Sequence, residues 1–396
     1  AILWRDRRAT RQVSWLRSNV GEKILESTYQ WPAVNWSLPY LMWLKEEEPA
    51  TWRSMRRVLF TNDYVRFRLT GEWLTDPVMA IGSMLLDAGK REWSSWVCGL
   101  IDLPLEYLPP IRPSFSVAGQ VSARAAGETG LRAGTPVITG SSDQAAETLA
   151  IGAVEPGDGV LKLATAGNVA CVLERPFPHR KLITYYHALP GLWYQMGGSS
   201  SAAVCYDWLR SLLHGDGGDY EEMNRSASQV PPGAEGLIFH PYLQGDFVSP
   251  NMRGAFVGLT MRHGPAHFAR AVLEGVAFSM RELLERLLEA GVPWPRSFRL
   301  VGGGNKSPLW RQILCDCLGV EGLVPSKSDS SFGSAMMAGV GIGVFGDIHE
   351  AVTACTSIRD RVLPNPDNHS KYQELYRLYR EAAAGLEPGY SRWFEG

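Results

Sequence analysis

The chain has 396 residues, of which 45% are hydrophobic and 20% charged, and its net charge at pH 7 is −2. This length predicts two or three domains, and the composition is ordinary for a globular protein. The near-neutral charge gives no electrostatic support for binding nucleic acid or an anionic membrane, and the longest apolar run, Ala335–Phe345, is too short to span a bilayer. Six scattered cysteines without a C-x-x-C pair indicate reduced thiols in a cytoplasmic enzyme.

The first part of the chain is predicted to be mostly helical, from apolar periodicity, capping residues and turn signals. The predicted helices are Arg5–Val20, Asn35–Glu48, Thr61–Leu69 and a helix from Pro77 to about Asp87. A Pro-rich connection at Leu103–Pro113 leads to two predicted strands, Val117–Val121 and Pro136–Thr139, and to a helix, Gln144–Gly152. The linker-like stretch Glu155–Gly159 then predicts a boundary between a domain of residues 1–157 and a domain of residues 158–396.

The second part mixes strands with longer helices. Its predicted strands are Gly159–Leu163, Asn168–Leu173, Leu192–Met196, Gly236–His240, Gly254–Leu259 and Ser297–Val301. Its predicted helices are Ser200–Leu213, His267–Ala290, Ser307–Leu318, Ser331–Phe345 and Asn368–Gly385. The alternation of strands and helices in both parts predicts an α/β fold.

Asp143 stands where a buried strand passes through a Gly-Ser-Ser turn into an Ala-rich helix. Ligands of α/β proteins bind at such carboxyl ends of strands. Ser and Asp are also common N-cap residues, so these residues alone favour a helix cap over a catalytic carboxylate. The two roles do not exclude each other, because a helix N-terminus favours the ionised form of a carboxylate.

Glycine turns in the second part could approach a phosphate closely. Thr165-Ala166-Gly167 joins two predicted strands and offers a hydroxyl and backbone N–H groups, although a plain hairpin turn explains it equally well. Gly302-Gly303-Gly304 ends a strand before a helix, without the further glycines of a Walker or dinucleotide motif. Gly197-Gly198 is a weaker candidate.

Other chemistries have less support. No G-x-S-x-G elbow and no catalytic triad are visible. His263 and His267 have a spacing that would suit a metal, but Gly264-Pro265 between them favours two solvated loop histidines, and no metal ligands are predicted. A carboxylate at a strand end together with phosphate-compatible turns is typical of phosphoryl transfer.

Several ordered motifs resemble the FGGY family of carbohydrate kinases, nearest its xylulokinase-like branch. Gly254–Leu259, seven residues, and then His267–Glu274 match the second family signature. Asn35–Glu47 resembles the first signature and departs from it at Asn35 and Tyr40. Further similar stretches are Asp63–Glu72, Thr75-Asp76, Asp87–Trp93 and Gly302–Gln312. The resemblance covers essentially the whole chain.

The resemblance implies two actin-like, RNase H-type domains with a cleft between them, residues 1–157 binding mainly the sugar and residues 158–396 mainly ATP with Mg²⁺. Asp143 matches the family's general base. Thr165 and Gly167 match the phosphate-binding turn, and Gly303, Gly304 and Asn305 the adenosine side. Trp4, Asp6 and Asn35 fall at sugar-side positions.

Family members open with a strand–turn–strand that binds phosphate and Mg²⁺, and this chain begins after it, at Ala1-Ile2-Leu3-Trp4. We therefore expect the first domain to be incomplete and this polypeptide alone to have weak kinase activity or none.

The resulting hypothesis is an ATP-dependent kinase that phosphorylates a hydroxyl of a ketopentose such as xylulose, with Asp143 as general base. Glycerol or another polyol is the alternative acceptor, and a non-catalytic ATP- or sugar-binding protein is the alternative from another class. The expected partner is a small sugar or polyol, with no nucleic acid and no membrane. The oligomeric state stays open, with a homodimer as one option.

Overall fold

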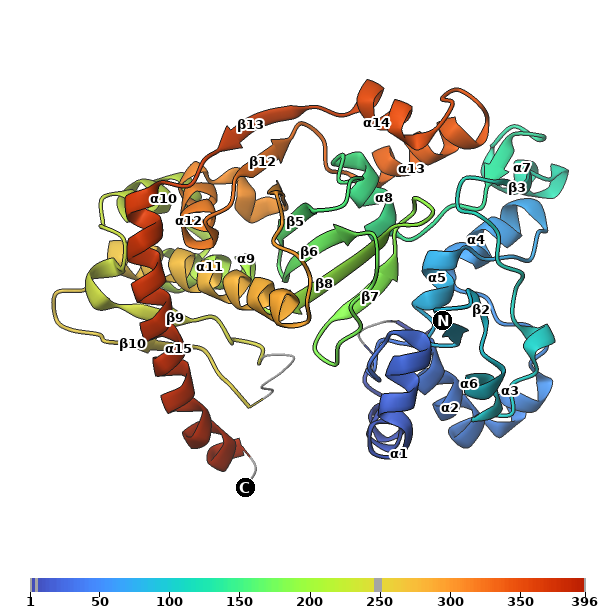
Figure 1. Ribbon diagram of the computed structural model, residues 1–396, viewed down its shortest axis with the longest axis horizontal. Coiled ribbons are helices and arrows are strands. Elements are labelled where there is room, and N and C mark those ends of the chain that lie inside the picture. The colour runs from blue at the N-terminus through green and yellow to red at the C-terminus, as the bar shows by residue number, and fades with distance from the viewer. Residues whose placement is uncertain (1, 4–5, 246–250, 395–396) are drawn as a thin grey trace. The chain divides into compact units, whose positions relative to one another are not determined.

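The computed structural model describes residues 2–3, 6–245 and 251–394 (Figure 1). Contacts divide the chain into two compact units, and neither unit is continuous in sequence. The first unit comprises Ala1–Val154, Leu173–Gln195 and Lys327–Ser357, and the second comprises Glu155–Val172, Met196–Ser326 and Ile358–Gly396. The predicted boundary between a domain of residues 1–157 and a domain of residues 158–396 stays a prediction. Each compact unit consists of three separate segments, so the two units do not correspond to two continuous halves of the chain.

The first unit is mainly helical. Its helices are α1 (Thr10–Thr28), α2 (Ser37–Glu47), α3 (Pro49–Ser54), α4 (Thr61–Thr70), α5 (Pro77–Ile81), α6 (Ser95–Gly99), η1 (Leu105–Tyr107), α7 (Ala123–Thr129), α8 (Asp143–Ala150), α13 (Ser330–Gly341) and α14 (Ile348–Cys355). Its strands are β1 (Leu86–Asp87), β2 (Glu92–Trp93), β3 (Val117–Gln120), β4 (Pro136–Ile138), β7 (Ile183–Tyr186) and the first residues of β8 (Trp193–Ser199).

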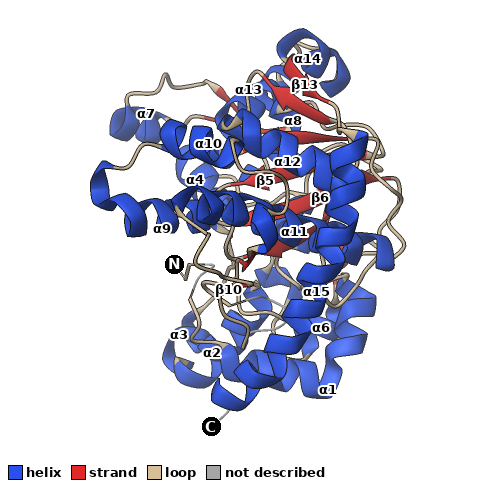
Figure 2. Ribbon diagram, turned by 90° about the vertical axis from the view of Figure 1, so that its left-hand side faces the viewer, coloured by secondary structure: helices blue, strands red, loops and turns tan. Residues whose placement is uncertain are grey.

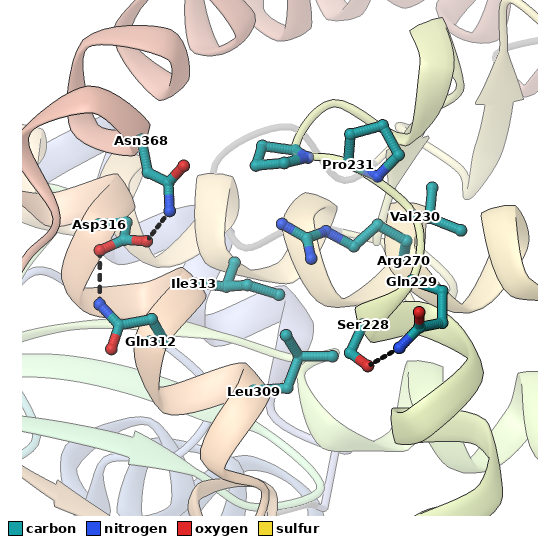
Figure 3. Close-up of a pocket in the computed structure, with 11 residues that line it drawn as sticks. Ser228, Gln229, Val230, Pro231, Arg270, Leu309, Gln312, Ile313, Asp316 and Asn368 are labelled. Carbon is teal, nitrogen blue, oxygen red and sulfur yellow. Dashed lines mark hydrogen bonds between the residues drawn. The ribbon is translucent and has the colours of Figure 1, made fainter.

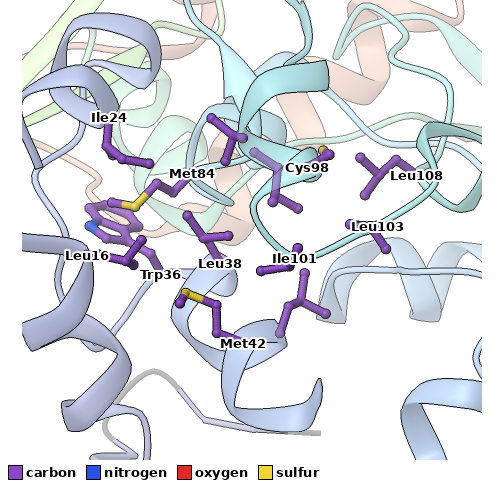
Figure 4. Close-up of a cluster of buried hydrophobic side chains, with 13 residues drawn as sticks. Leu16, Ile24, Trp36, Leu38, Met42, Met84, Cys98, Ile101, Leu103 and Leu108 are labelled. Carbon is purple, nitrogen blue, oxygen red and sulfur yellow. The ribbon is translucent and has the colours of Figure 1, made fainter. Parts of the chain in front are cut away.

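A hydrophobic core holds the early helices of this unit together (Figure 4). Leu16 and Ile24 of α1 meet Leu38 and Met42 of α2, and each of these four side chains is at least nine-tenths buried. Trp36, Met84, Cys98, Ile101, Leu103 and Leu108 complete much of the cluster. Leu16 and Ile24 lie eight residues apart, so the helical repeat places both on the same face of α1.

The predicted helix from Pro77 to about Asp87 is wrong beyond Ile81, where α5 ends. The backbone then turns, and Leu86–Asp87 pairs as β1 with Glu92–Trp93 of β2. Asp76 caps the short helix by accepting from the backbone N–H groups of Val78 and Met79. Pairing between residues that are close in sequence therefore replaces the last turn of the predicted helix.

The second unit is built on a β-sheet. Its strands are β5 (Asp158–Leu163), β6 (Gly167–Leu173), β9 (Ile238–His240), β10 (Ala255–Val257), β11 (Ser297–Val301), β12 (Gly322–Pro325), β13 (Ile358–Val362) and the last residues of β8. Its helices are α9 (Ala203–His214), η2 (Gly215–Gly217), α10 (Tyr220–Ser228), η3 (Ala234–Gly236), α11 (Pro265–Glu289), η4 (Gly303–Lys306), α12 (Pro308–Leu318) and α15 (Pro366–Phe394).

The sheet strands follow the order β13-β12-β11-β5-β6-β8-β7, and β9 and β10 pair separately. β5 is antiparallel to β6 and parallel to β11, with Val301 opposite Lys162. Because parallel strands end at the same sheet edge, the segments that follow β5 and β11 come together there. β5 is buried along almost its whole length, as expected for a central strand covered on both faces.

Helices α11 and α12 lie beside strands β5 and β6 (Figure 2). A side-chain carbon added to Gly167 of β6 would lie 2.8 Å from the Met280 methyl carbon of α11, so this helix packs directly on the strand. All six cysteines are free thiols. Within the described ranges, we find no helix with the length and apolar character that crossing a membrane requires.

Candidate functional site

Asp143 is the first residue of α8, and its side chain is exposed. The N-cap is Ser142, whose Oγ accepts from the backbone N–H of Ala145 at 3.2 Å. The interpretation of Asp143 as the helix cap is therefore wrong by one residue. The Asp143 carboxylate accepts from the N–H of Gln144 at 2.8 Å and forms no ion pair among the described residues. A carboxylate at a helix N-terminus that is free of ion pairs can accept a proton from a ligand.

Tyrosine side chains lie next to the N-terminus of α8. Ser142 and Gln144 of α8 line a small pocket together with Tyr185 of β7 and Tyr194 of β8, and the Gln144 amide donates to the Tyr194 hydroxyl at 3.0 Å. Burial raises the pKa of Tyr185, and the negative charge of Asp143 raises it further. The Tyr185 ring also meets the Trp36 ring edge-on, with centroids 6.0 Å apart. The sequence motifs did not identify Tyr185, because its position depends on the pairing of β7.

Helix α8 is held by α13, a helix far away in sequence. The two helices approach so closely that a side-chain carbon added to Gly333 would lie 1.8 Å from the backbone oxygen of Ala146. The interior of α8 is buried from Ala145 to Ala150. The small residues of α13 thus allow the helix that carries Asp143 to lie against it.

Replacing Gly333 with alanine is expected to destabilise the protein by about 1–3 kcal/mol, because the new methyl group overlaps backbone that moves only if α8 moves. Urea unfolding measures the loss. Gly339→Ala on the same helix is the control, because its methyl group would meet ring atoms of Phe345 at 2.8 Å, which a side-chain rotation can relieve. Equal stability of the two variants would contradict this account of the packing.

The three sugar-side residues have different surroundings. Trp4 lies outside the described residues. The carboxylate of Asp6 accepts from the backbone N–H and the Nε of Arg8, both at 2.9 Å, and these bonds lower its pKa. Asn35 is half-buried and precedes Trp36, whose ring contacts Tyr185. No hydrogen bond or ion pair between described residues joins Asp6 or Asn35 to Asp143.

The turn Thr165-Ala166-Gly167 joins β5 and β6. Thr165 is exposed, and its carbonyl accepts from the N–H of Ala202 at 3.0 Å, which fixes the turn against the start of α9. Within the described structure, the Thr165 hydroxyl has no hydrogen-bond partner. Gly167 is packed between Ala202 and Met280, so no larger residue fits there.

The turn after β11 lies against the end of β5. Gly302 has φ +91°, and a side-chain carbon there would lie 2.3 Å from the carbonyl oxygen of Leu163. Gly303 is exposed and has open space around it, whereas Gly304 packs on Leu163 and Trp310. The structure therefore brings the predicted phosphate-side and adenosine-side turns, which are more than a hundred residues apart in sequence, to the same edge of one sheet.

Asn305 is 4% exposed. Its amide donates to the carbonyls of Val301 at 2.5 Å and of Leu161 at 3.4 Å, which ties the ends of β11 and β5 together. Its Oδ1 is buried and has no hydrogen-bond partner among the residues that the structure describes. The side chain thus fixes the position of the turn, and a contact with adenosine stays a prediction.

A larger pocket of about 270 Å³ lies elsewhere in the second unit, between α10, α11, α12 and α15 (Figure 3). Its charged groups are already satisfied internally. Asp316 accepts from the side chains of Gln312 and Asn368 at 2.7 and 2.9 Å, and Arg270 donates to Glu274 and Tyr372. The part of the chain that the structure describes contains no group of three or more His, Cys, Asp or Glu side chains that could hold a metal ion.

Comparison with known proteins identifies the family to which the chain belongs. Residues 1–150 match the N-terminal domain of the FGGY family of carbohydrate kinases, and residues 165–342 match its C-terminal domain. Xylulose kinase of Escherichia coli is 31% identical over 396 residues, covering 98% of this chain and 80% of that protein. Xylulose kinase of Bacillus subtilis is 30% identical, covering 96% of this chain and 77% of that protein.

Solved structures agree with the sequence comparison. The xylulose kinase from Rhodospirillum rubrum has a TM-score of 0.90 and 30% identity, over 97% of this chain and 79% of that chain. The xylulose kinase from Brucella ovis has a TM-score of 0.89 and 28% identity, over 98% of this chain and 80% of that chain. These similarities confirm the predicted α/β, two-domain, actin-like fold. The chain belongs to the FGGY family of carbohydrate kinases and is a carbohydrate kinase.

Proposed function

We propose that the protein transfers the γ-phosphoryl group of ATP to a hydroxyl of a ketopentose such as xylulose, with Asp143 as general base. The relatives named xylulose kinase in Escherichia coli and Bacillus subtilis support the choice of sugar. The observation that carries the assignment of the base is the exposed Asp143 carboxylate at the N-terminus of α8, which no described cation neutralises.

The chemistry asked of Asp143 is removal of one proton from the attacking sugar hydroxyl. The bond from the Gln144 N–H limits the rotation of the carboxylate. Beside it, burial and the Asp143 charge both keep the Tyr185 phenol protonated, so its O–H can donate to a substrate oxygen. We propose Trp4, Asp6 and Asn35 as further sugar-side residues.

ATP would bind at the two turns that meet at the ends of β5 and β11. The fit rests on the unpartnered hydroxyl of Thr165, the open space at Gly303 and the orphaned Oδ1 of Asn305. Gly167 and Gly304 keep bulky side chains out of the same region. Bound MgATP supplies the phosphoryl group and the metal charge that offsets its negative oxygens. We propose that Thr165 donates a hydrogen bond to a phosphate oxygen.

The substrate assignment is tested by ADP release from the protein expressed from its whole gene, with ATP, Mg²⁺ and a panel of ketopentoses, aldopentoses and polyols. We expect turnover with xylulose to exceed turnover with glycerol. Preference for glycerol would replace the ketopentose with a polyol. ATP binding without ADP release for any acceptor would instead favour a protein that binds sugar or ATP without catalysis.

We propose a cytoplasmic location. The six free thiols support it, because disulfides are rare in cytosolic proteins.

A further inference from the structure

The turn before Asp143 is tied to a buried carboxylate from a distant part of the first unit. Ser141 Oγ donates to Oδ2 of Asp76 at 2.6 Å. Asp76 is the N-cap of α5, is 1% exposed and lies 65 positions earlier in the sequence. Ser141 is two residues before the proposed base, so this bond fixes the backbone from which α8 begins.

The Asp76 carboxylate accepts four hydrogen bonds from described residues. Oδ2 accepts from Ser141, from Ser114 Oγ at 2.8 Å and from the N–H of Val78 at 3.3 Å, while Oδ1 accepts from the N–H of Met79 at 3.0 Å. Burial raises the pKa of this carboxyl, and the donated hydrogen bonds oppose that effect. Because a buried carboxylate depends on such donors, its position and the position of Ser141 are coupled.

Thr139, on the other side of Gly140, is also fixed by a hydrogen bond from a buried side chain. Arg66, which is 4% exposed, donates from Nη1 to the carbonyl of Thr139 and from Nη2 to Oδ1 of Asp63 at 2.9 Å. The N–H of Gly140 donates to the carbonyl of Ser114 at 2.9 Å, and Gly140 has φ +74°. Buried charged groups thus fix Thr139 and Ser141, the two neighbours of the one glycine in this turn.

We propose that Asp76 is a positioning residue for the proposed base, acting through Ser141 to set where the Asp143 carboxylate meets the sugar hydroxyl. This inference rests on the proposed function of Asp143. Proton transfer depends strongly on geometry, and a displacement of about 1 Å can cost about 10²-fold in rate. Loosening the turn should therefore lower kcat for the sugar, while the affinity for ATP stays unchanged.

The chain offers a matched pair of substitutions. Ser141→Ala and Ser114→Ala each remove one hydroxyl that donates to the same oxygen of Asp76, so both should lower the melting temperature similarly. Only Ser141 belongs to the turn that leads into α8. We expect Ser141→Ala to lower kcat by about 10–100-fold and Ser114→Ala by less than about threefold. Ser141→Thr retains the hydroxyl and should recover most of the rate.

Hydrogen–deuterium exchange of the amides of residues 140–144 gives a second readout that does not need turnover. Exchange should rise in Ser141→Ala and stay near the parent value in Ser114→Ala. Equal kcat losses in the two alanine variants, or an unchanged kcat in Ser141→Ala, would overturn the inference and leave the proposed function standing. A parent protein expressed from its whole gene that releases no ADP with any sugar would overturn the proposed function, and the positioning role with it.

Discussion

Replacing Asp143 with asparagine is expected to lower kcat for sugar phosphorylation by about 10²–10⁴-fold, which is the usual contribution of a general base. Asparagine has nearly the same shape and can still accept from the Gln144 N–H through its carbonyl oxygen, but it cannot take up the hydroxyl proton. Ser142 caps α8, so the helix should keep its stability. A coupled assay of ADP release at saturating sugar measures kcat, and calorimetric titration measures the affinity for ATP, which should not change.

Asp347→Asn is the control for this substitution. Asp347 is the N-cap of α14 in the same unit and accepts from the N–H of Glu350 at 2.8 Å, a role that asparagine also fills. We expect its kcat to stay within about twofold of the parent value. If Asp143→Asn turned over sugar as fast as this control, Asp143 would not be the base.

The longest predicted helix was placed well from the sequence, whereas the helix predicted at Arg5–Val20 is α1, Thr10–Thr28. The helix predicted at His267–Ala290 is α11, Pro265–Glu289, because its apolar positions recur over many turns and Pro265 marks its start. Shorter elements were predicted less well. The helix predicted to reach Phe345 ends at Gly341, and the chain then takes positive φ at Gly343. Strand β7 was not predicted, because its four residues carry too short a pattern to separate from a loop.

In the candidate site, too, local features were predicted from the sequence and contacts between distant segments were not. Motifs identified Asp143 and the glycine turns from local patterns, strand–turn–helix at Asp143 and Gly302–Gly304 and strand–turn–strand at Thr165–Gly167. The environment of Asp143 depends on residues that reach it only after folding: Tyr185 by pairing of β7 and β8, Gly333 by packing of α13, and Asp76 by the bond to Ser141. Such contacts between distant segments leave no periodic trace in the sequence, so only the structure could identify them.

Replacing Arg270 with methionine is expected to destabilise the second unit by about 3–5 kcal/mol, because it leaves the charge of Glu274 buried without its partner. Arg270 Nε donates to Glu274 Oε1 at 2.6 Å, and the two side chains are 6% and 3% exposed. Glu274 also accepts from the N–H of Gly233 at 3.0 Å and from the hydroxyl of Tyr372 at 2.8 Å. The pair therefore joins α11 to the segment before β9 and to α15, and equilibrium unfolding in urea measures the loss.

The large loss of stability expected for Arg270→Met comes from the burial of this ion pair. An exposed ion pair with the same i,i+4 spacing is the control, because it has the same helical geometry without the burial. Arg124 and Glu128 of α7 form an i,i+4 ion pair at 2.8 Å, but their side chains are 78% and 47% exposed. Arg124→Met should cost only about 0.3–0.5 kcal/mol.

Adding Glu274→Gln to Arg270→Met should restore part of the lost stability, because glutamine removes the buried charge and still accepts from Gly233 and Tyr372. Two outcomes would contradict this explanation: a double variant no more stable than Arg270→Met, or equal losses for Arg270→Met and Arg124→Met. Either would mean that the unpaired buried charge of Glu274 does not cause the loss of stability.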